Sequence, residues 1–357
     1  MNQSPEYLFF DDTLALYNSM LDDFENAEKS IHIETYIFAD DEIGRKFKNT
    51  LIKKAKQKIK IILLIDSWGS NVSESYFSEL IKLGGIVKFF NKINILRLDY
   101  FTENHKRNHR KLIIIDNKIT YIGSANINSY CLNWKESMLR INNEISITFN
   151  KIFYQNLSIS YKYFFYKYPH IKPYTYKNYQ IIRDVPSNLI QNIKTAYISL
   201  INNSQKRIVI ESPYFLPGTK IIKSLINAVK RGVDVKIIMP KHSDVVLIDI
   251  LRDRYLGILH NGGVKIYYYT TQNLHAKLMI VDNNKFAIGS ANFDYRSFRF
   301  QFEILFTGIN KNIVQMIDNH LNNIYNDCEN FNSDIWMKRP FFQKILEKIL
   351  LPFRHLF

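Results

Sequence analysis

Short apolar runs bounded by polar turns alternate along this chain with longer segments of helical periodicity. Residues 31–38 and 59–66 are isoleucine-rich runs of strand length. The segment between them, residues 42–57, has apolar side chains at near-helical spacing. The same order of strand, helix and strand returns over residues 207–239. Alternation of this kind predicts an α/β fold with one sheet in each half of the chain.

The two halves also repeat each other in sequence. Residues 31–38 align with residues 208–215 at an offset of 177 positions. Residues 109–126 align with residues 275–292 at an offset of 166, so the first half carries 11 extra residues before position 109. We therefore expect two α/β sandwich domains related by a pseudo-twofold axis, each with a mixed sheet flanked by helices.

The predicted first domain covers residues 1–165 and the second covers residues 188–335. Residues 166–187 contain three prolines and several Tyr and Lys residues, which predicts an ordered linker rather than a flexible tether. The 11 extra residues of the first half lie within residues 91–108. We expect this segment to form either an apolar lip at the mouth of a pocket or a packed loop. The apolar residues of this insertion are Ile93, Ile95, Leu96, Leu98, Tyr100 and Phe101.

Residues 336–357 are predicted to form a basic amphipathic tail. Their apolar side chains follow i, i+3, i+4 spacing, and five basic residues stand against one acidic residue, Glu347. Such a helix lies on a membrane surface or packs on the protein's own core, and the pattern fits both. The apolar stripe consists of Phe342, Ile345, Leu346, Ile349, Leu350 and Phe353.

Composition and charge narrow the class of protein. The chain has 357 residues, with 48 Lys and Arg against 33 Asp and Glu, and its net charge is +15. With 46% hydrophobic and 23% charged residues, its composition is globular, which excludes wholesale disorder. Two cysteines suit a reducing compartment, and no apolar run reaches the roughly 20 residues of a membrane span. The charge predicts a polyanionic partner, either nucleic acid or an anionic membrane surface.

One polar pattern occurs once in each half, in register with the wider repeat. It reads His-x-Lys-x4-Asp and is followed, seven residues after the Asp, by Gly-Ser-Ala-Asn. A chance match at seven fixed positions has odds of about one in 10^9 per starting point, so two matches in register are no coincidence. The first copy contains His109, Lys111, Asp116, Ser124 and Asn126, and the second contains His275, Lys277, Asp282, Ser290 and Asn292.

The spacing gives this pattern a chemical meaning. Residues two apart on a strand point to the same face, so each His shares a face with its Lys. Two halves that face each other then offer two imidazoles, two ammonium groups and four neutral polar groups, which suits one phosphoryl group. One imidazole attacks phosphorus while the other protonates the leaving oxygen. A cation beside each His opposes a metal site, so we expect neither a metal nor a cofactor.

The twin motifs resemble those of the phospholipase D superfamily over about residues 5–335, and flanking segments resemble bacterial cardiolipin synthases. These segments are residues 34–44, 107–111, 134–140, 212–217 and 292–303. The resemblance implies two phospholipase D-like domains and a metal-independent ping-pong reaction. A phosphohistidine forms on His109, and His275 acts first as general acid and then as general base.

The resemblance also implies roles for the other motif residues. Lys111 and Lys277 belong to the catalytic set with Asp116 and Asp282, although both aspartates also fit as plain turn residues. The implied phosphate-binding side chains are Ser124, Asn126, Ser290 and Asn292. Glu136 and Glu303 are implied as polar support for the two His, and Glu136 lies one residue out of the repeat register.

The implied function is that of a cardiolipin synthase-type phosphatidyltransferase, which joins a phosphatidyl group to phosphatidylglycerol and releases glycerol. Its implied partners are phosphatidylglycerol and an anionic phospholipid membrane, with the enzyme peripheral on the cytoplasmic side of the cell membrane. The alternatives are a phospholipase D-type hydrolase and a nuclease or phosphodiesterase; nucleic acid is the less favoured partner, because small nucleases of the superfamily carry one motif per chain. Intact His, Lys, Ser and Asn in both copies oppose a degenerate scaffold. The sequence does not indicate an oligomeric state.

Overall fold

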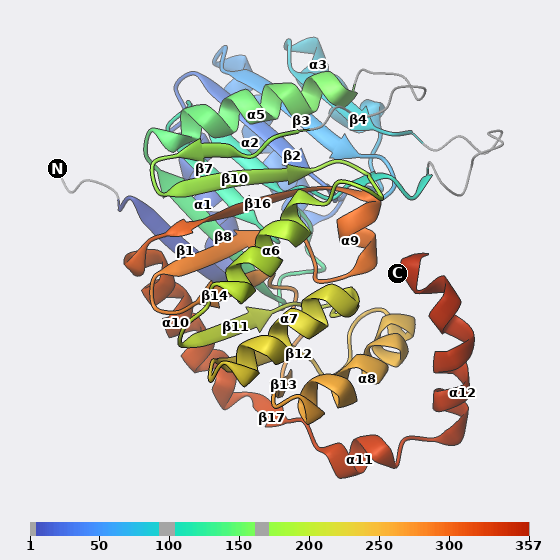
Figure 1. The fold of residues 1–357 in the computed structure, drawn as a ribbon. Coiled ribbons are helices and arrows are strands. Elements are labelled where there is room, and N and C mark those ends of the chain that lie inside the picture. The colour runs from blue at the N-terminus through green and yellow to red at the C-terminus, as the bar shows by residue number, and fades with distance from the viewer. Residues whose placement is uncertain (1–4, 93–103, 161–170, 357) are drawn as a thin grey trace.

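Two sheets, each with helices packed against it, make up the protein (Figure 1). The computed structural model describes residues 5–92, 104–160 and 171–356. The predicted mixed α/β fold with one sheet in each half is confirmed. The apolar residues of the predicted lip, 93–101, lie outside the described residues, as does the start of the predicted linker.

The first sheet is formed by strands from the first 142 residues. They are β1 (Tyr7–Asp12), β2 (Ser30–Thr35), β3 (Lys60–Asp66), β4 (Ile86–Phe90), β6 (Leu112–Ile115), β7 (Ile119–Gly123) and β8 (Lys135–Asn142). Their order across the sheet is β1-β8-β7-β6-β2-β3-β4, with β2 parallel to β3 and antiparallel to β6. The helices of this half are α1 (Thr13–Glu25), α2 (Glu42–Lys56), α3 (Ser78–Lys82) and α5 (Ile145–Ser160), with a 3-10 turn η1 (Glu74–Phe77).

The second sheet repeats this arrangement and takes one short strand, β5 (Arg107–Asn108), from the first half. Its other strands are β9 (Tyr174–Tyr176), β10 (Tyr179–Asp184), β11 (Arg207–Glu211), β12 (Asp234–Pro240), β13 (Lys265–Tyr269), β14 (Leu278–Val281), β15 (Lys285–Gly289), β16 (Gln301–Ile309) and β17 (Cys328–Asn330). They lie in the order β17-β13-β12-β11-β14-β15-β16-β10-β9, and β5 pairs with β16. The helices are α6 (Asn192–Asn202), α7 (Gly218–Lys230), α8 (Val246–Asn261), α9 (Tyr295–Arg299), α10 (Lys311–Asn326), α11 (Ser333–Met337) and α12 (Phe341–Leu350), followed by a 3-10 turn η2 (Leu351–Leu356).

Several helices begin at a side chain that caps them. Asp41 accepts a hydrogen bond from Gly44 N at the start of α2, and Asn310 accepts from Asn312 N and Ile313 N at the start of α10. Caps of this kind satisfy backbone donors that a helix leaves unpaired at its first turn. None of the described helices is long and apolar enough to cross a bilayer.

The linker boundary predicted from the prolines is wrong in its second part. Within residues 166–187, β9 and β10 already belong to the second sheet, where β10 pairs along its whole length with β16. Ile181 and Ile182 of β10 are buried on opposite faces of that sheet. The second domain therefore begins no later than β9, which starts at Tyr174.

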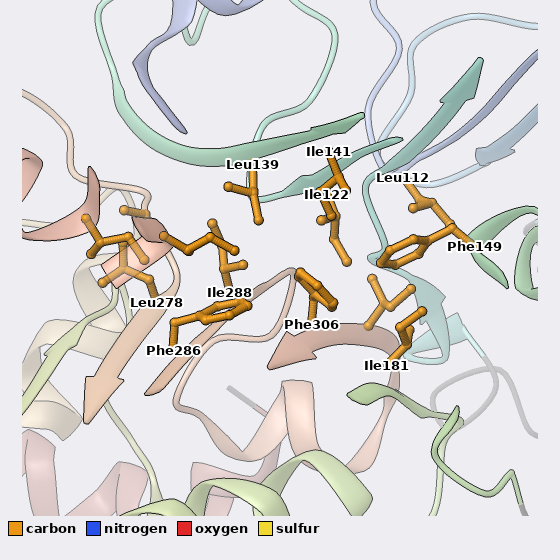
Figure 2. Packing of buried hydrophobic residues seen from close by; sticks show 14 of the residues in the cluster. Leu112, Ile122, Leu139, Ile141, Phe149, Ile181, Leu278, Phe286, Ile288 and Phe306 are labelled. Atoms are coloured by element: carbon orange, nitrogen blue, oxygen red, sulfur yellow. The ribbon is translucent and has the colours of Figure 1, made fainter. Parts of the chain in front are cut away.

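The two sheets face each other across one shared core (Figure 2). Strand residues alternate between two clusters: Leu112 and Ile114 of β6 point into the shared core, while Ile113 and Ile115 point to the outer core of the first half. β14 does the same in the second half. Strands buried on both faces explain why these runs are continuously apolar. Ten side chains from the two halves meet in Figure 2: Leu112, Ile122, Leu139, Ile141, Phe149, Ile181, Leu278, Phe286, Ile288 and Phe306.

A buried imidazolium also connects the two halves. His320 of α10 contacts Asp11 of β1 through Nδ1 at 2.9 Å and Glu211 of β11 through Nε2 at 2.8 Å. Burial alone would lower the pKa of His320, but Glu211 and Asp11 together raise it to about 9. The ring is therefore protonated at neutral pH, and it bridges carboxylates from the first and the second half.

We predict that this bridge makes stability depend on pH above neutrality. A histidine whose pKa is raised in the folded state stabilises the protein fully below its unfolded value of about 6.5 and loses that contribution as the pH rises through about 9. The contribution of His320 to the free energy of unfolding should fall by about 3 kcal/mol across this window. Urea unfolding of the wild type and of His320→Asn at several pH values measures it as the difference in stability between the two proteins. This difference should shrink as the pH rises, whereas the difference between the wild type and the exposed His242→Asn control should stay constant; a difference between the wild type and His320→Asn that does not change with pH would contradict the bridge.

Candidate active site

Each motif histidine is held by the backbone of the opposite half. β5 leads into His109 and runs parallel to the start of β16, so His109 N donates to Phe302 O at 3.1 Å. Correspondingly, His275 N donates to Lys135 O at the start of β8 at 2.7 Å. The two contacts are equivalent under exchange of the halves, which is the relation that a pseudo-twofold axis requires.

The side chains of the histidines follow the same exchange. His109 Nδ1 lies 3.0 Å from Glu303 Oε1, and His275 Nδ1 lies 2.9 and 3.0 Å from the two carboxylate oxygens of Glu136. Both glutamates are fully buried. Because a carboxylate accepts, we assign the proton to Nδ1 of each ring, which leaves Nε2 of a neutral ring with a free lone pair. The structure thus brings together the four side chains that the sequence proposed as two acid–base groups and their support.

Ser124 and Ser290 do not reach the substrate space, which corrects their prediction as phosphate ligands. Ser124 Oγ donates to Glu136, and Ser290 Oγ donates to Glu303. Both serines are completely buried and lie outside the lining of the pocket. Each hydroxyl holds the carboxylate that in turn holds a histidine, so these serines position the acid–base groups indirectly.

Asp116 and Asp282 are also far from the chemistry, and their place in the catalytic set is corrected. They follow β6 and β14 at the ends opposite to the histidines, both with a positive φ of 55°. Asp116 accepts hydrogen bonds from the backbone of residues 28–30, and Asp282 accepts from residues 205–207. A carboxylate with several backbone donors fixes a loop. The two aspartates thus connect each motif to the start of the neighbouring strand, which is β2 in the first half and β11 in the second.

The motif lysines and asparagines lie at two different depths around the pocket. Asn126 and Asn292 line the pocket, whereas Lys111 and Lys277 are buried behind the lining. Each lysine Nζ donates to the carbonyl of the His two residues before it, at 2.7 Å for Lys111 and 2.8 Å for Lys277. Asn292 Oδ1 is buried without a hydrogen-bond partner among the described residues. The pocket therefore keeps unused polar capacity next to its two imidazoles.

A single cavity of about 270 Å³ contains both imidazoles. Tyr36 packs edge-on against His109 at 5.1 Å between ring centroids, and Trp134 does so against His275 at 5.2 Å. A wider depression of about 690 Å³ adjoins the cavity and shares Tyr130 and Trp134 with it. The remaining polar lining includes Asn128, Tyr214, Asp244, Asp294, Arg296 and Gln301.

Electrostatics make the two histidines unequal. Burial, then Lys111 and Lys277, hold the pKa of His109 well below its usual range, so this ring is neutral at pH 7. Burial also lowers the pKa of His275, but Glu136 opposes that shift directly. The pKa of Glu136 is lowered, because His275 and Lys277 outweigh its burial, whereas burial raises the pKa of Glu303. His275 thus has the more anionic partner and retains a proton more readily.

The pKa values of the two motif lysines lie near neutral pH. Burial and mutual repulsion lower the pKa of Lys111 to about 7, and burial lowers that of Lys277 to about 8. An anion in the cavity would favour their charged forms. The site is therefore electrostatically incomplete without a negatively charged ligand.

A second set of buried charges fixes the segment around His109. Glu34 of β2 accepts from Asn108 Nδ2 at 2.9 Å and lies 3.4 Å from Arg110 Nη1. Asp66 at the end of β3 accepts from Asn108 N at 2.8 Å and contacts Arg107 at 3.3 Å. These contacts lock the residues on both sides of the histidine, since all of them are buried.

The chain also matches a known protein family. Residues 20–157 and 197–325, well over half of the chain, match the family model described as "Cardiolipin synthase, PLD-like domain". The chain belongs to this family. The resemblance that the twin motifs predicted is therefore confirmed, and each matched segment contains one His–Lys pair.

Curated relatives of the family align along most of the chain. A cardiolipin synthase of Clostridium perfringens is 33% identical, over 96% of this chain and 75% of the relative. A cardiolipin synthase of Listeria monocytogenes is 31% identical, over 98% of this chain and 75% of the relative. The crystal structure of phosphatidylserine synthase from Haemophilus influenzae superposes with a TM-score of 0.75 over 99% of this chain and 96% of that chain, at 13% identity. At that identity, the last comparison supports the shared fold alone.

Four residues that line the cavity could not be found from the repeated motif alone. Asn128 and Asp294 follow the two motif asparagines by two positions, and Tyr130 and Arg296 follow them by four. Extending the repeat register four residues past each asparagine would have found all four. Their identities differ between the halves, so a search for repeated residue types passes over them.

We predict that replacing Glu136 shifts the pH dependence of turnover. Its carboxylate favours the protonated form of His275, so Glu136→Gln should lower the pKa of that ring. Where His275 must carry a proton, the limb of the kcat/KM profile that declines with rising pH should move to lower pH. Glu144→Gln, at an exposed position two residues beyond the end of β8, serves as the matched control. An unshifted limb in Glu136→Gln would remove this carboxylate from the acid–base machinery.

Proposed function

We propose that this cardiolipin synthase-type phosphatidyltransferase works through a phosphohistidine on His109. In the first half-reaction, His109 Nε2 attacks the phosphorus of a phosphatidylglycerol. The bond from phosphorus to the headgroup oxygen breaks, His275 gives its proton to that oxygen, and glycerol leaves. The observation that carries this proposal is the pair of imidazoles in one cavity, each with Nδ1 fixed by a buried glutamate.

The second half-reaction transfers the phosphatidyl group to an alcohol. His275, now neutral, takes the proton from a primary hydroxyl of a second phosphatidylglycerol, whose oxygen attacks the phosphohistidine. The phosphorus–nitrogen bond breaks, cardiolipin forms, and the proton taken by His275 restores the starting state. Two phosphatidylglycerols thus yield one cardiolipin and one glycerol, so all atoms balance.

The unequal histidines support this assignment of roles. A nucleophile needs a lone pair, and the lowered pKa of His109 keeps its ring neutral. A general acid needs a proton, and the anionic Glu136 favours it on His275. Lys111, Lys277, Asn126 and Asn292 are proposed to stabilise charge on the non-bridging phosphate oxygens.

The partners follow from the same chemistry. The adjoining depression offers room for the headgroup of the second lipid beside the cavity. We propose that the enzyme works at the surface of an anionic phospholipid membrane, which holds both substrates, and the net charge of +15 supports that attraction. Two cysteines without disulfides, Cys131 and Cys328, are compatible with the cytoplasmic side.

The reaction is tested on purified protein with phosphatidylglycerol vesicles in the presence of EDTA. We expect equimolar cardiolipin and glycerol, because the proposed mechanism relies on side chains for all proton transfers and charge stabilisation. His109→Ala and His275→Ala should each lower the rate by about a thousandfold or more. Phosphatidic acid with no cardiolipin would indicate a hydrolase instead, and cleavage of plasmid DNA without a lipid product would indicate a nuclease. Full activity in either variant would exclude the two-histidine mechanism.

A substrate with an activated leaving group separates the roles of the two histidines. Phosphatidyl p-nitrophenol needs no general acid in the first step, because p-nitrophenolate leaves without a proton. We therefore expect His275→Ala to release one equivalent of p-nitrophenol per enzyme in a burst and then stall, whereas His109→Ala releases none. A burst from His109→Ala in place of His275→Ala would reverse the assignment.

A further inference from the structure

Helix α12 packs on the protein with its polar face. Glu347 is 7% exposed and is the only buried side chain of this helix. Its carboxylate lies 3.7 Å from Arg254 of α8 and 3.4 Å from Arg339. Gln343, one turn earlier, donates to Asp253 of α8 at 2.7 Å. Leu350 packs beside them against the core of the second half, so the contact face of α12 combines polar side chains with one leucine, whereas a surface helix usually turns its whole apolar stripe to the core.

The rest of the apolar stripe of α12 points away from the protein. Phe342 is 83% exposed and Ile349 is 58% exposed, and Phe341 and Phe353 are exposed as well. Residues 342, 345 and 349 recur on one side of the helix, opposite to residues 343, 347 and 350. Figure 1 shows α12 along the outer side of α8, with the C-terminal end of the chain turned toward α9. Sequence periodicity found this stripe but left its direction open.

We propose that the outward face of α12 is a docking surface for an anionic lipid bilayer and that it seats the enzyme on the membrane that holds its substrate. The inference that docking favours turnover rests on the proposed function. The binding of α12 to a bilayer does not depend on the catalytic chemistry. Apolar side chains would enter the boundary between headgroups and acyl chains. Lys348 of the same helix and Lys338 just before it are exposed, and both could contact anionic headgroups.

Continuity with the catalytic pocket supports a bilayer as the occupant. α8, which carries α12, begins at the pocket: Val245 and Ile248 line the cavity, and Val246 between them is exposed. η2 follows α12 in the chain, and its Arg354 lies 5.9 Å from the ring of Tyr295. Tyr295 directly precedes the pocket residue Arg296 in the sequence. The apolar face and the pocket are thus joined by α8 and by the η2–α9 contact.

Charge argues against a second copy of this chain as the occupant. In a twofold dimer formed through α12, the exposed lysines beside the stripe would bring like charges into one interface. An anionic bilayer instead matches both the apolar stripe and its basic border. The apolar area and the charge therefore favour the same partner.

The test compares the full-length protein with the double variant Phe342→Glu/Ile349→Glu. The control is Ile147→Glu/Ile309→Glu, which introduces the same two charges at half-exposed isoleucines on α5 and at the end of β16 remote from the pocket. We expect the α12 variant to bind phosphatidylglycerol vesicles at least about tenfold more weakly in sedimentation, with an unchanged melting temperature, and the control to bind like the wild type. Turnover of a short-chain phosphatidylglycerol dissolved as monomers should be equal in all three proteins.

Two results would overturn the proposal. The first is vesicle binding by the α12 variant equal to that of the wild type. The second is a wild-type dimer in light scattering that dissociates in the α12 variant, which would make a second copy the occupant. A different result is a wild type that makes no cardiolipin and still binds vesicles more tightly than the α12 variant. That result would refute the proposed function and leave the proposed docking surface intact.

Discussion

Two buried imidazole–carboxylate pairs, each formed between the halves, are the constraint on which this structure depends. His109 needs Glu303 and the carbonyl of Phe302, and His275 needs Glu136 and the carbonyl of Lys135. Neither half can complete its own pair. The shared apolar core between the sheets has to place the halves correctly, because a shift of about 1 Å would separate donors from acceptors. Packing far from the cavity thereby determines the geometry of catalysis.

The same arrangement places several ionisable side chains together in the protein interior. Two lysines and two glutamates are almost fully buried around the two imidazoles. Burial without full compensation is costly, and the lowered pKa values of both lysines express that cost. A phosphodiester would bring negative charge next to these lysines, so in the proposed mechanism substrate binding favours their charged forms. The charges proposed to stabilise the reaction are already in place in the folded protein.

The fold and the central four side chains could be predicted from the sequence, because a repeat of strands with twin motifs admits few arrangements. The errors have a common physical origin. Motif spacing does not show which partner a side chain meets across strands. The sequence therefore predicts Ser124 as a phosphate ligand, although it holds a glutamate, and leaves Asp116 open between the catalytic set and a turn, where it fixes a loop. Periodicity found the stripe of α12 but not its direction, which the contacts of Glu347 determine. The linker was misplaced because its prolines concealed β9 and β10, the last two strands at one end of the second sheet.

Fusion of the two halves in one chain has a consequence for how such a site can change. In a symmetric dimer every substitution appears on both walls of the pocket at once. Here Tyr130 faces the cavity from the first half, while the equivalent position of the second half is Arg296; Asn128 and Asp294 differ in the same way. Covalent duplication therefore lets one wall acquire charge while the other stays neutral. A symmetric scaffold can in this way distinguish a donor from an acceptor that carry the same headgroup.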